Sequence, residues 1–220
     1  MGIGHMVGFM PKSMSERSVI TGFELDGIPG RIAQQLYPDA VIHVAGYETQ
    51  YKPNSQDAIV TNVPFGQTAP IDPALDKALR RKIGGAYNLH NYFIVKGLLE
   101  LKPGGVGAFI TSAATMDGRN TKAREYIAGL GVDLIGAIRL PNTTFSKNAG
   151  TEVTADILFF RKRLPGEPSN GVNFVSLSQV GTGTYKGKDK NGNDALLEVP
   201  LFVNEYFAQH PEMMLGTVMT

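Results

Sequence analysis

Short runs of β-branched residues alternate with longer segments of helical periodicity along most of the chain. This pattern predicts strands at residues 19–24, 41–45, 57–61 and 106–111, and helices at residues 27–36 and 121–130. Another helix is predicted after Asn88, which can cap its first turn, and the turn-forming residues 102–105 end it. The alternation indicates βαβ units and a mostly parallel, doubly wound α/β sheet.

Two further strands, at residues 134–140 and 153–161, follow one another without room for a packed crossover helix. We therefore expect an antiparallel hairpin at one edge of the sheet. Turn-forming residues then follow Leu164 closely. We expect a main domain over residues 1–163 and a small C-terminal appendage over residues 164–220. In the appendage we expect short strands, a charged hairpin tip at residues 186–194 and a helix at residues 201–209.

Composition narrows the possible chemistry only in part. The net charge is +1, from 21 basic and 20 acidic residues, so binding to nucleic acid would need local basic patches or a separate basic domain. The absence of cysteine excludes disulfides, thiolate metal sites and a cysteine nucleophile. The histidines show no metal spacing, so we expect no metal site. We find no apolar run of membrane-spanning length and no signal peptide, and we expect a cytoplasmic protein.

The most informative stretch is the predicted strand that runs directly into Asn62-Val63-Pro64-Phe65. Open α/β sheets place their ligands at such strand ends. Pro64 favours an extended conformation at Val63, so we expect the Val63 carbonyl to lie beside the Asn62 side-chain amide. These two acceptors can take both protons of a planar amino group, and Phe65 can stack on its ring. An ordinary exit from strand to turn is the alternative.

Hydrogen bonding to both protons helps the nitrogen lone pair localise for attack on a methyl group, without a covalent intermediate. Asn62-Val63-Pro64-Phe65 resembles the (Asn/Asp/Ser)-Pro-Pro-(Tyr/Phe) signature of amino-methyltransferases, which methylate adenine N6, cytosine N4 or glutamine side chains. Val63 stands where many relatives have proline. Because the backbone carbonyl does the work, valine can supply it.

Other segments recur in the same order in this family, and together they resemble the methylase part of large helicase–methylase proteins of mobile elements and phages. They are Phe23-Glu24-Leu25-Asp26, His90-Asn91-Tyr92-Phe93, 110–112, 115–117, Arg139-Leu140-Pro141-Asn142, 149–153, 156–160, 204–207 and 210–212. The resemblance implies a Rossmann-like methyltransferase of the restriction–modification kind that uses S-adenosylmethionine and methylates adenine N6 in DNA. It also implies base extrusion and partner domains for helicase activity or target recognition.

Cofactor contacts are predicted near the start of the chain. Gly2 and Gly4 resemble the glycine loop through which a backbone approaches S-adenosylmethionine. The family has a strand before this loop, so we expect the first strand to be missing and the chain to be an N-terminally truncated fragment. Glu24 ends the next predicted strand, where an acid can bind both ribose hydroxyls. Asp26 is a second candidate, although it is better placed as a helix N-cap.

Two further positions are predicted to border the cofactor. Glu48 follows the strand at residues 41–45, where relatives contact the adenine ring, and a solvated loop is the alternative. Asn62 is expected to lie at the junction of cofactor and target.

The target pocket is predicted from two segments. His90 and Asn91 can line it, whereas the aromatic residues that follow them are expected in the core. Arg139 and Asn142 leave a strand at the same face, in a region that helps to form the extruded-base pocket of relatives. The basic residues 80–82 can hold a DNA phosphate or form a solvated charge run.

Other functions stay open on these residues. The substrate could be a protein glutamine or an RNA base, because the Asn62 motif alone does not separate amino groups. An inactive methylase-fold binding module is a second alternative, which the missing first strand supports. A nicotinamide oxidoreductase leaves the Asn62 motif unexplained.

Overall fold

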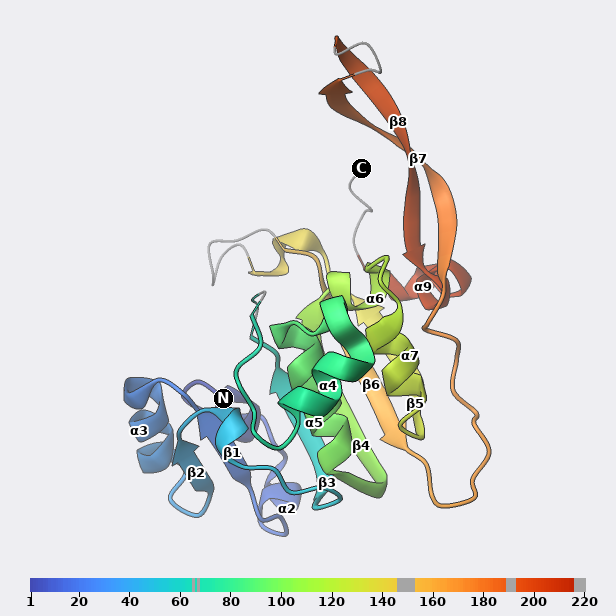
Figure 1. The fold of residues 1–220 in the computed structure, drawn as a ribbon. Coiled ribbons are helices and arrows are strands. Elements are labelled where there is room, and N and C mark those ends of the chain that lie inside the picture. Colours follow the sequence, from blue (N-terminus) through green and yellow to red (C-terminus); the bar gives the residue numbers. More distant parts are fainter. Residues whose placement is uncertain (65, 67, 146–152, 189–192, 216–220) are drawn as a thin grey trace.

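A four-stranded sheet forms the centre of the protein (Figure 1). The computed structural model describes residues 1–64, 66, 68–145, 153–188 and 193–215. The strand order is β3 (Gln56–Asn62), β4 (Leu101–Ser112), β6 (Ala155–Lys162) and β5 (Val132–Arg139). β3 is parallel to β4, and β6 is antiparallel to both β4 and β5. The predicted antiparallel pair at the sheet edge is therefore confirmed.

A second, two-stranded sheet contains the parallel strands β1 (Thr21–Glu24) and β2 (Val41–Val44). The short helices α1 (His5–Gly8) and α2 (Lys12–Ser15) precede it, and α3 (Gly27–Leu36) connects its strands. α3 begins after Asp26, whose side chain accepts a hydrogen bond from the Ile28 amide at 2.9 Å. The predicted N-cap is confirmed.

In the part of the chain that the structure describes, no strand pairing joins the two sheets. Among the described residues, no strand pairs with the second edge of β1 or of β3, and Val60 on β3 is 57% exposed. The expectation that a first strand is missing stays a prediction.

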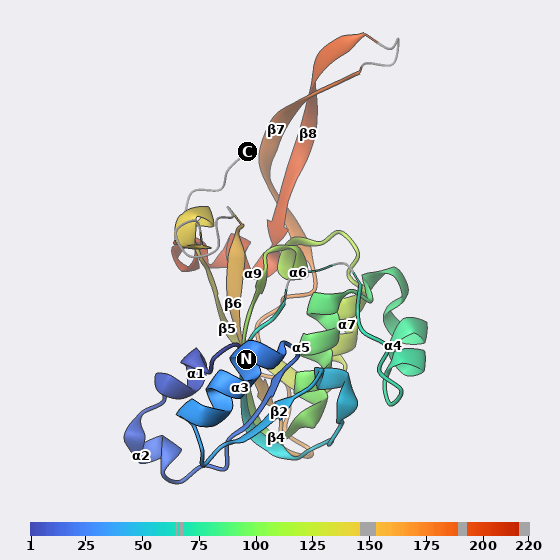
Figure 2. The same cartoon turned by 90° about the vertical axis from the view of Figure 1, so that its left-hand side faces the viewer.

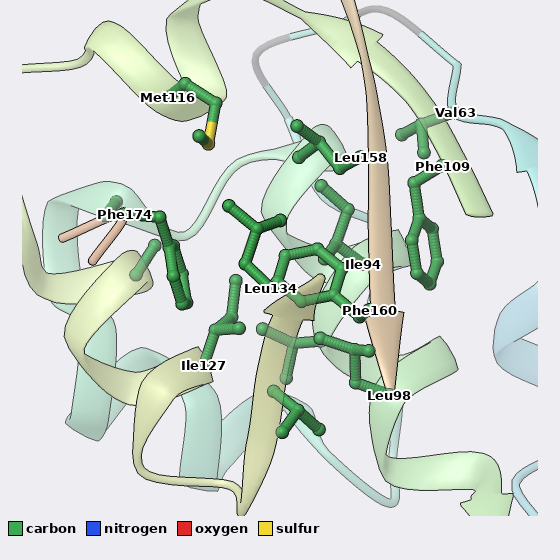
Figure 3. Packing of buried hydrophobic residues seen from close by; sticks show 14 of the residues in the cluster. Val63, Ile94, Leu98, Phe109, Met116, Ile127, Leu134, Leu158, Phe160 and Phe174 are labelled. Carbon is green, nitrogen blue, oxygen red and sulfur yellow. The ribbon is translucent and has the colours of Figure 1, made fainter. Parts of the chain in front are cut away.

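Helices pack on the four-stranded sheet and enclose the main core (Figures 1 and 3). The longest is α5 (Leu89–Glu100), which Asn88 caps by accepting from the Asn91 amide at 2.9 Å, as predicted. Leu98, Phe109 and Phe160 lie in the core, each at most 1% exposed. Burial of each such side chain contributes about 1.5–3 kcal/mol. The remaining helical elements here are η1 (Tyr47–Thr49), α4 (Asp76–Ile83), η2 (Gly84–Ala86), α6 (Ala114–Asp117), α7 (Lys122–Ala128) and η3 (Asn142–Phe145).

The C-terminal segment forms a long antiparallel hairpin that projects from the body (Figures 1 and 2). Its strands are β7 (Leu177–Lys188) and β8 (Asp194–Asn204), and α9 (Glu205–Gln209) and η4 (Pro211–Met213) follow. The expectation of short strands is wrong. The predicted helical start at residue 201 is also wrong, because residues 201–204 pair with β7. α9 instead begins after Asn204, whose side chain accepts from the Tyr206 amide at 3.1 Å.

Residues at the base of the hairpin share the core of the main body. Phe174, Val203, Tyr206 and Phe207 belong to the same buried cluster as Leu134 and Leu158. The division between residues 163 and 164 stays a prediction.

Candidate active site

The Asn62 motif follows the end of β3 directly. Asn62 lies opposite Ile110 of β4, and the Val63 amide donates to the Ile110 carbonyl at 2.8 Å. The Val63 side chain is 1% exposed and packs near Phe109 (Figure 3), whereas Asn62 and Pro64 are exposed. Valine, which stands where many relatives have proline, therefore anchors the motif in the core.

The two proposed acceptors of the motif differ in exposure. Asn62 is exposed, whereas Val63 is 1% exposed as a whole residue, backbone included. Among the described residues, neither the Asn62 side-chain amide nor the Val63 carbonyl has a hydrogen-bond partner, and the acceptor role of Val63 stays a prediction. Phe65 lies outside the described residues, so its stacking role stays a prediction. Asn62 can thus present its side chain at the carboxyl end of a parallel strand, the usual ligand position in such sheets.

Glu24 ends β1 and lies against the glycine loop. Its carboxylate accepts hydrogen bonds from the Gly2 amide at 2.6 Å, the Met1 ammonium at 2.8 Å and the Asp26 amide at 2.9 Å. Partial burial raises the pKa of Glu24, whereas hydrogen bonds to its carboxylate, including those from the Asp26 and Gly2 amides, lower it. Glu24 is therefore ionised at neutral pH.

The glycine loop adopts backbone conformations that glycine tolerates and other residues rarely adopt. Gly2 and Gly4 have φ values of 59° and 92°, which side-chain-bearing residues rarely adopt. A Cβ at Gly4 would also collide with the Tyr37 ring. The structure places the exposed Gly2 against Glu24, whereas Gly4 is buried against the Tyr37 ring. The cofactor roles of Gly2, Gly4 and Glu24 stay predictions.

The other predicted cofactor residues are placed less directly. The Asp26 carboxylate is engaged as the cap of α3. Glu48 lies in η1, the turn after β2, with its carboxylate close to Gly46. The cofactor roles of Asp26, Glu48 and Asn62 stay predictions.

The predicted target residues are largely buried. His90 and Asn91 lie in the first turn of α5 and are 8% and 6% exposed. The Asn91 side chain donates to the Ala86 carbonyl at 2.8 Å. Burial lowers the pKa of His90, which favours a neutral imidazole. Asn142 begins η3, the turn after β5.

Arg139 forms a buried ion-pair network. It is 7% exposed and donates to both Asp156 oxygens, at 2.8 and 2.9 Å, and to Asp117 at 2.7 Å. Its guanidinium lies 4.3 Å from the centroid of the Phe207 ring. The described contacts of Arg139 therefore join β5, β6, α6 and α9. Its role in target binding stays a prediction.

The basic run on α4 is partly paired. Arg80 donates to Asp76 at 2.8 Å and lies 4.7 Å from the Tyr87 ring centroid, while Arg81 and Lys82 are exposed. A phosphate contact by this run stays a prediction.

Sequence reasoning missed a buried polar cluster around α5. Tyr92 and Lys96 are both 0% exposed, and Glu100 is 6% exposed. Together with Tyr47 and Asp72 they form connected hydrogen bonds. The available signal was their spacing of four residues along an otherwise apolar helix.

Neither a metal site nor a membrane span is found in the part of the chain that the structure describes. No group of three or more His, Asp or Glu side chains there could hold a metal ion. None of the helices there is both long and apolar enough to cross a bilayer.

Solved structures share this fold at low sequence identity. A putative class I S-adenosylmethionine-dependent methyltransferase from Listeria monocytogenes matches with a TM-score of 0.58 and 17% identity, over 76% of this chain and 53% of that chain. The modification subunit of a putative type I restriction enzyme from Vibrio vulnificus matches with a TM-score of 0.55 and 18% identity, over 73% of this chain and 37% of that chain. The M protein of the type I restriction enzyme EcoKI matches with a TM-score of 0.52 and 20% identity, over 76% of this chain and 36% of that chain. The protein therefore has the Rossmann-like fold of S-adenosylmethionine-dependent methyltransferases.

Sequence comparison then identifies the family. The model of the N-6 DNA methylases matches residues 31–195, and the chain belongs to this family. Family and fold together imply S-adenosylmethionine as the cofactor. "Defense against restriction protein B" of Escherichia phage P1 is 30% identical over 169 residues, which cover 74% of this chain. The chain spans about 7% of the length of that relative.

Proposed function

We propose that this methyltransferase transfers a methyl group from S-adenosylmethionine to the N6 amino group of adenine in DNA. The observation that carries the proposal is the arrangement at the end of β3. Val63 fixes the backbone through its buried side chain and its bond to Ile110, while Asn62 is exposed. Asn62 can therefore offer an exposed acceptor from a rigid support, and the Val63 carbonyl is proposed as the second acceptor.

The chemistry follows from these acceptors. The Asn62 side-chain oxygen and the Val63 carbonyl each accept a hydrogen bond from one N–H of the target amino group, which localises the nitrogen lone pair for methyl transfer. Bound S-adenosylmethionine supplies the electrophilic methyl group. Acceptors held in place before the reaction stabilise the charge that develops on the amine without reorganising. Phe65 is proposed to stack on the adenine, which must leave the duplex to reach the site.

Other residues are proposed to bind rather than react. Glu24 accepts hydrogen bonds from the ribose hydroxyls, with Gly2 and Gly4 beside it. Asp26 and Glu48 complete the cofactor side. His90, Asn91, Arg139 and Asn142 are proposed to shape the target pocket. The proposed partners are DNA and further domains for target recognition or helicase activity. The proposed location is the cytoplasm.

Nucleoside analysis tests the proposal. The protein is incubated with tritiated S-adenosylmethionine and, in parallel reactions, with unmethylated DNA, RNA or protein. The nucleic acids are digested to nucleosides and the protein to amino acids. The proposal expects label in N6-methyladenine. Label in N4-methylcytosine, in RNA or in protein glutamine would overturn the substrate. A protein that binds S-adenosylhomocysteine or DNA but transfers no methyl group would instead be a binding module.

A further inference from the structure

Helix α5 carries a fully buried lysine that the proposed chemistry does not use. Lys96 has no exposed surface, and Asp72 beside it has none either. A buried ammonium group is costly unless it is paired and hydrogen-bonded. Replacing such a pair with apolar residues is often neutral or stabilising, so stability alone is a weak reason for its presence.

On one side, Lys96 holds the segment that follows the Asn62 motif. Its ammonium donates to Asp72 Oδ2 at 2.8 Å, and the Tyr92 hydroxyl donates to the same oxygen at 2.8 Å. The other oxygen, Oδ1, accepts from the amides of Ala74 and Leu75 at 2.9 and 3.2 Å. Residues 72–75 are therefore fixed to α5 through one carboxylate.

On the other side, Lys96 holds the turn that follows β2. The ammonium donates to the Tyr47 carbonyl at 2.7 Å and lies 4.5 Å from the centroid of the Tyr47 ring. The Tyr47 hydroxyl donates to Glu100 at 2.6 Å, and the second Glu100 oxygen accepts from the Lys52 amide at 3.1 Å. The η1 turn is thus fixed to the same face of α5.

We propose that Lys96 is a positioning residue that couples the η1 turn to the segment after the Asn62 motif. This inference rests on the proposed function, in which Glu48 of η1 faces the cofactor and Asn62 holds the target amine. The two segments follow different strands, β2 and β3, and meet at one ammonium group. Cofactor binding at η1 then favours the ordered form of residues 72–75. Because coupling is reciprocal, target binding raises the affinity of the η1 side for the cofactor by the same factor.

Amide hydrogen exchange in an isosteric variant separates coupling from local support. Asp72→Asn removes the charge that holds Lys96, yet no hydrogen bond among the described residues joins Asp72 to η1. The probe in η1 is the Thr49 amide, which donates to the Gly46 carbonyl at 3.1 Å. Coupling predicts that Thr49 exchanges about fivefold faster or more in this variant. Tyr92→Phe, which keeps the charge pair, is expected to raise the exchange rate of the Thr49 amide by a smaller factor.

The control is Lys102→Met, which breaks an exposed pair with Asp57 and is expected to leave Thr49 unchanged. Faster exchange confined to residues 72–76 in both Asp72→Asn and Tyr92→Phe would overturn the coupling. In the methyl transfer assay, coupling also predicts a higher KM for S-adenosylmethionine in Asp72→Asn, although Asp72 is outside η1. A wild-type protein without methyl transfer would refute the proposed function, while the exchange result would still decide the coupling.

Discussion

Replacing Arg139 with methionine should destabilise the protein more than any change at a surface ion pair. The guanidinium makes its bidentate contact with Asp156, which is 0% exposed, and a third bond with Asp117. Arg139→Met keeps much of the side-chain volume but leaves the Asp156 charge buried without its partner. Removing one partner of a buried pair costs about 3–5 kcal/mol.

The loss is measurable by urea unfolding and by calorimetry. For a chain of this size we expect Tm to fall by roughly 10 °C. A second variant, Arg139→Met with Asp156→Val, removes the stranded charge and is expected to recover most of the loss. Lys102→Met is the matched control, because its pair with Asp57 is exposed and should contribute no more than about 1 kcal/mol.

Either of two results would contradict the buried charge as the cause. The first is an Arg139→Met stability within about 1 kcal/mol of the wild type, which is the range of an exposed pair. The second is a double variant less stable than Arg139→Met, which would show that the cost does not come from the stranded Asp156 charge.

Two further predictions concern other carboxylates. Glu24→Gln is expected to weaken S-adenosylhomocysteine binding about tenfold or more, since hydrogen bonds to charged groups contribute about 1.5–3 kcal/mol. Titration calorimetry measures the Kd, with the exposed Glu16→Gln variant as the control. An unchanged Kd in Glu24→Gln contradicts the ribose role. Burial raises the pKa of Asp72, but hydrogen bonds from Lys96 and Tyr92 lower it below its usual value. The ionised Asp72 carboxylate therefore stabilises the fold fully above about pH 4, and this stabilisation is lost as the pH falls further. Asp72→Asn should then flatten the acid side of a plot of unfolding free energy against pH. An unchanged slope contradicts this.

Much of the sheet could be predicted because its signals are local. The short β-branched runs became β1, β2 and β3, and the caps at Asp26 and Asn88 were readable from residue type. The short link between β5 and β6 gave their antiparallel pairing. The long hairpin was not predictable in the same way, because β7 is rich in glycine and polar residues and the hairpin joins the core only at its base, through Val203.

The residues of the candidate site also differ in whether a local sequence signal marks them. Asn62 and Glu24 could be found because each ends a recognisable strand. The buried cluster around Lys96 could not, since its partners Tyr47 and Asp72 are 49 and 24 residues away and only the fold brings them together. Arg139 shows the opposite case, in which a strand-end position suggested a ligand contact and the side chain lies in a buried ion-pair network.

The most direct test of the central claim is the methyl transfer rate of Asn62→Ala in single-turnover conditions. If Asn62 accepts a hydrogen bond from the target amine, the rate with saturating S-adenosylmethionine should fall by about 10²–10³, the usual cost of losing one preorganised hydrogen-bonding group at a reacting centre. The Tm should stay close to wild type. Exposed Asn170→Ala, beside Asp133 at the other end of the sheet, should react normally. A rate for Asn62→Ala within a few-fold of the wild type would contradict the claim.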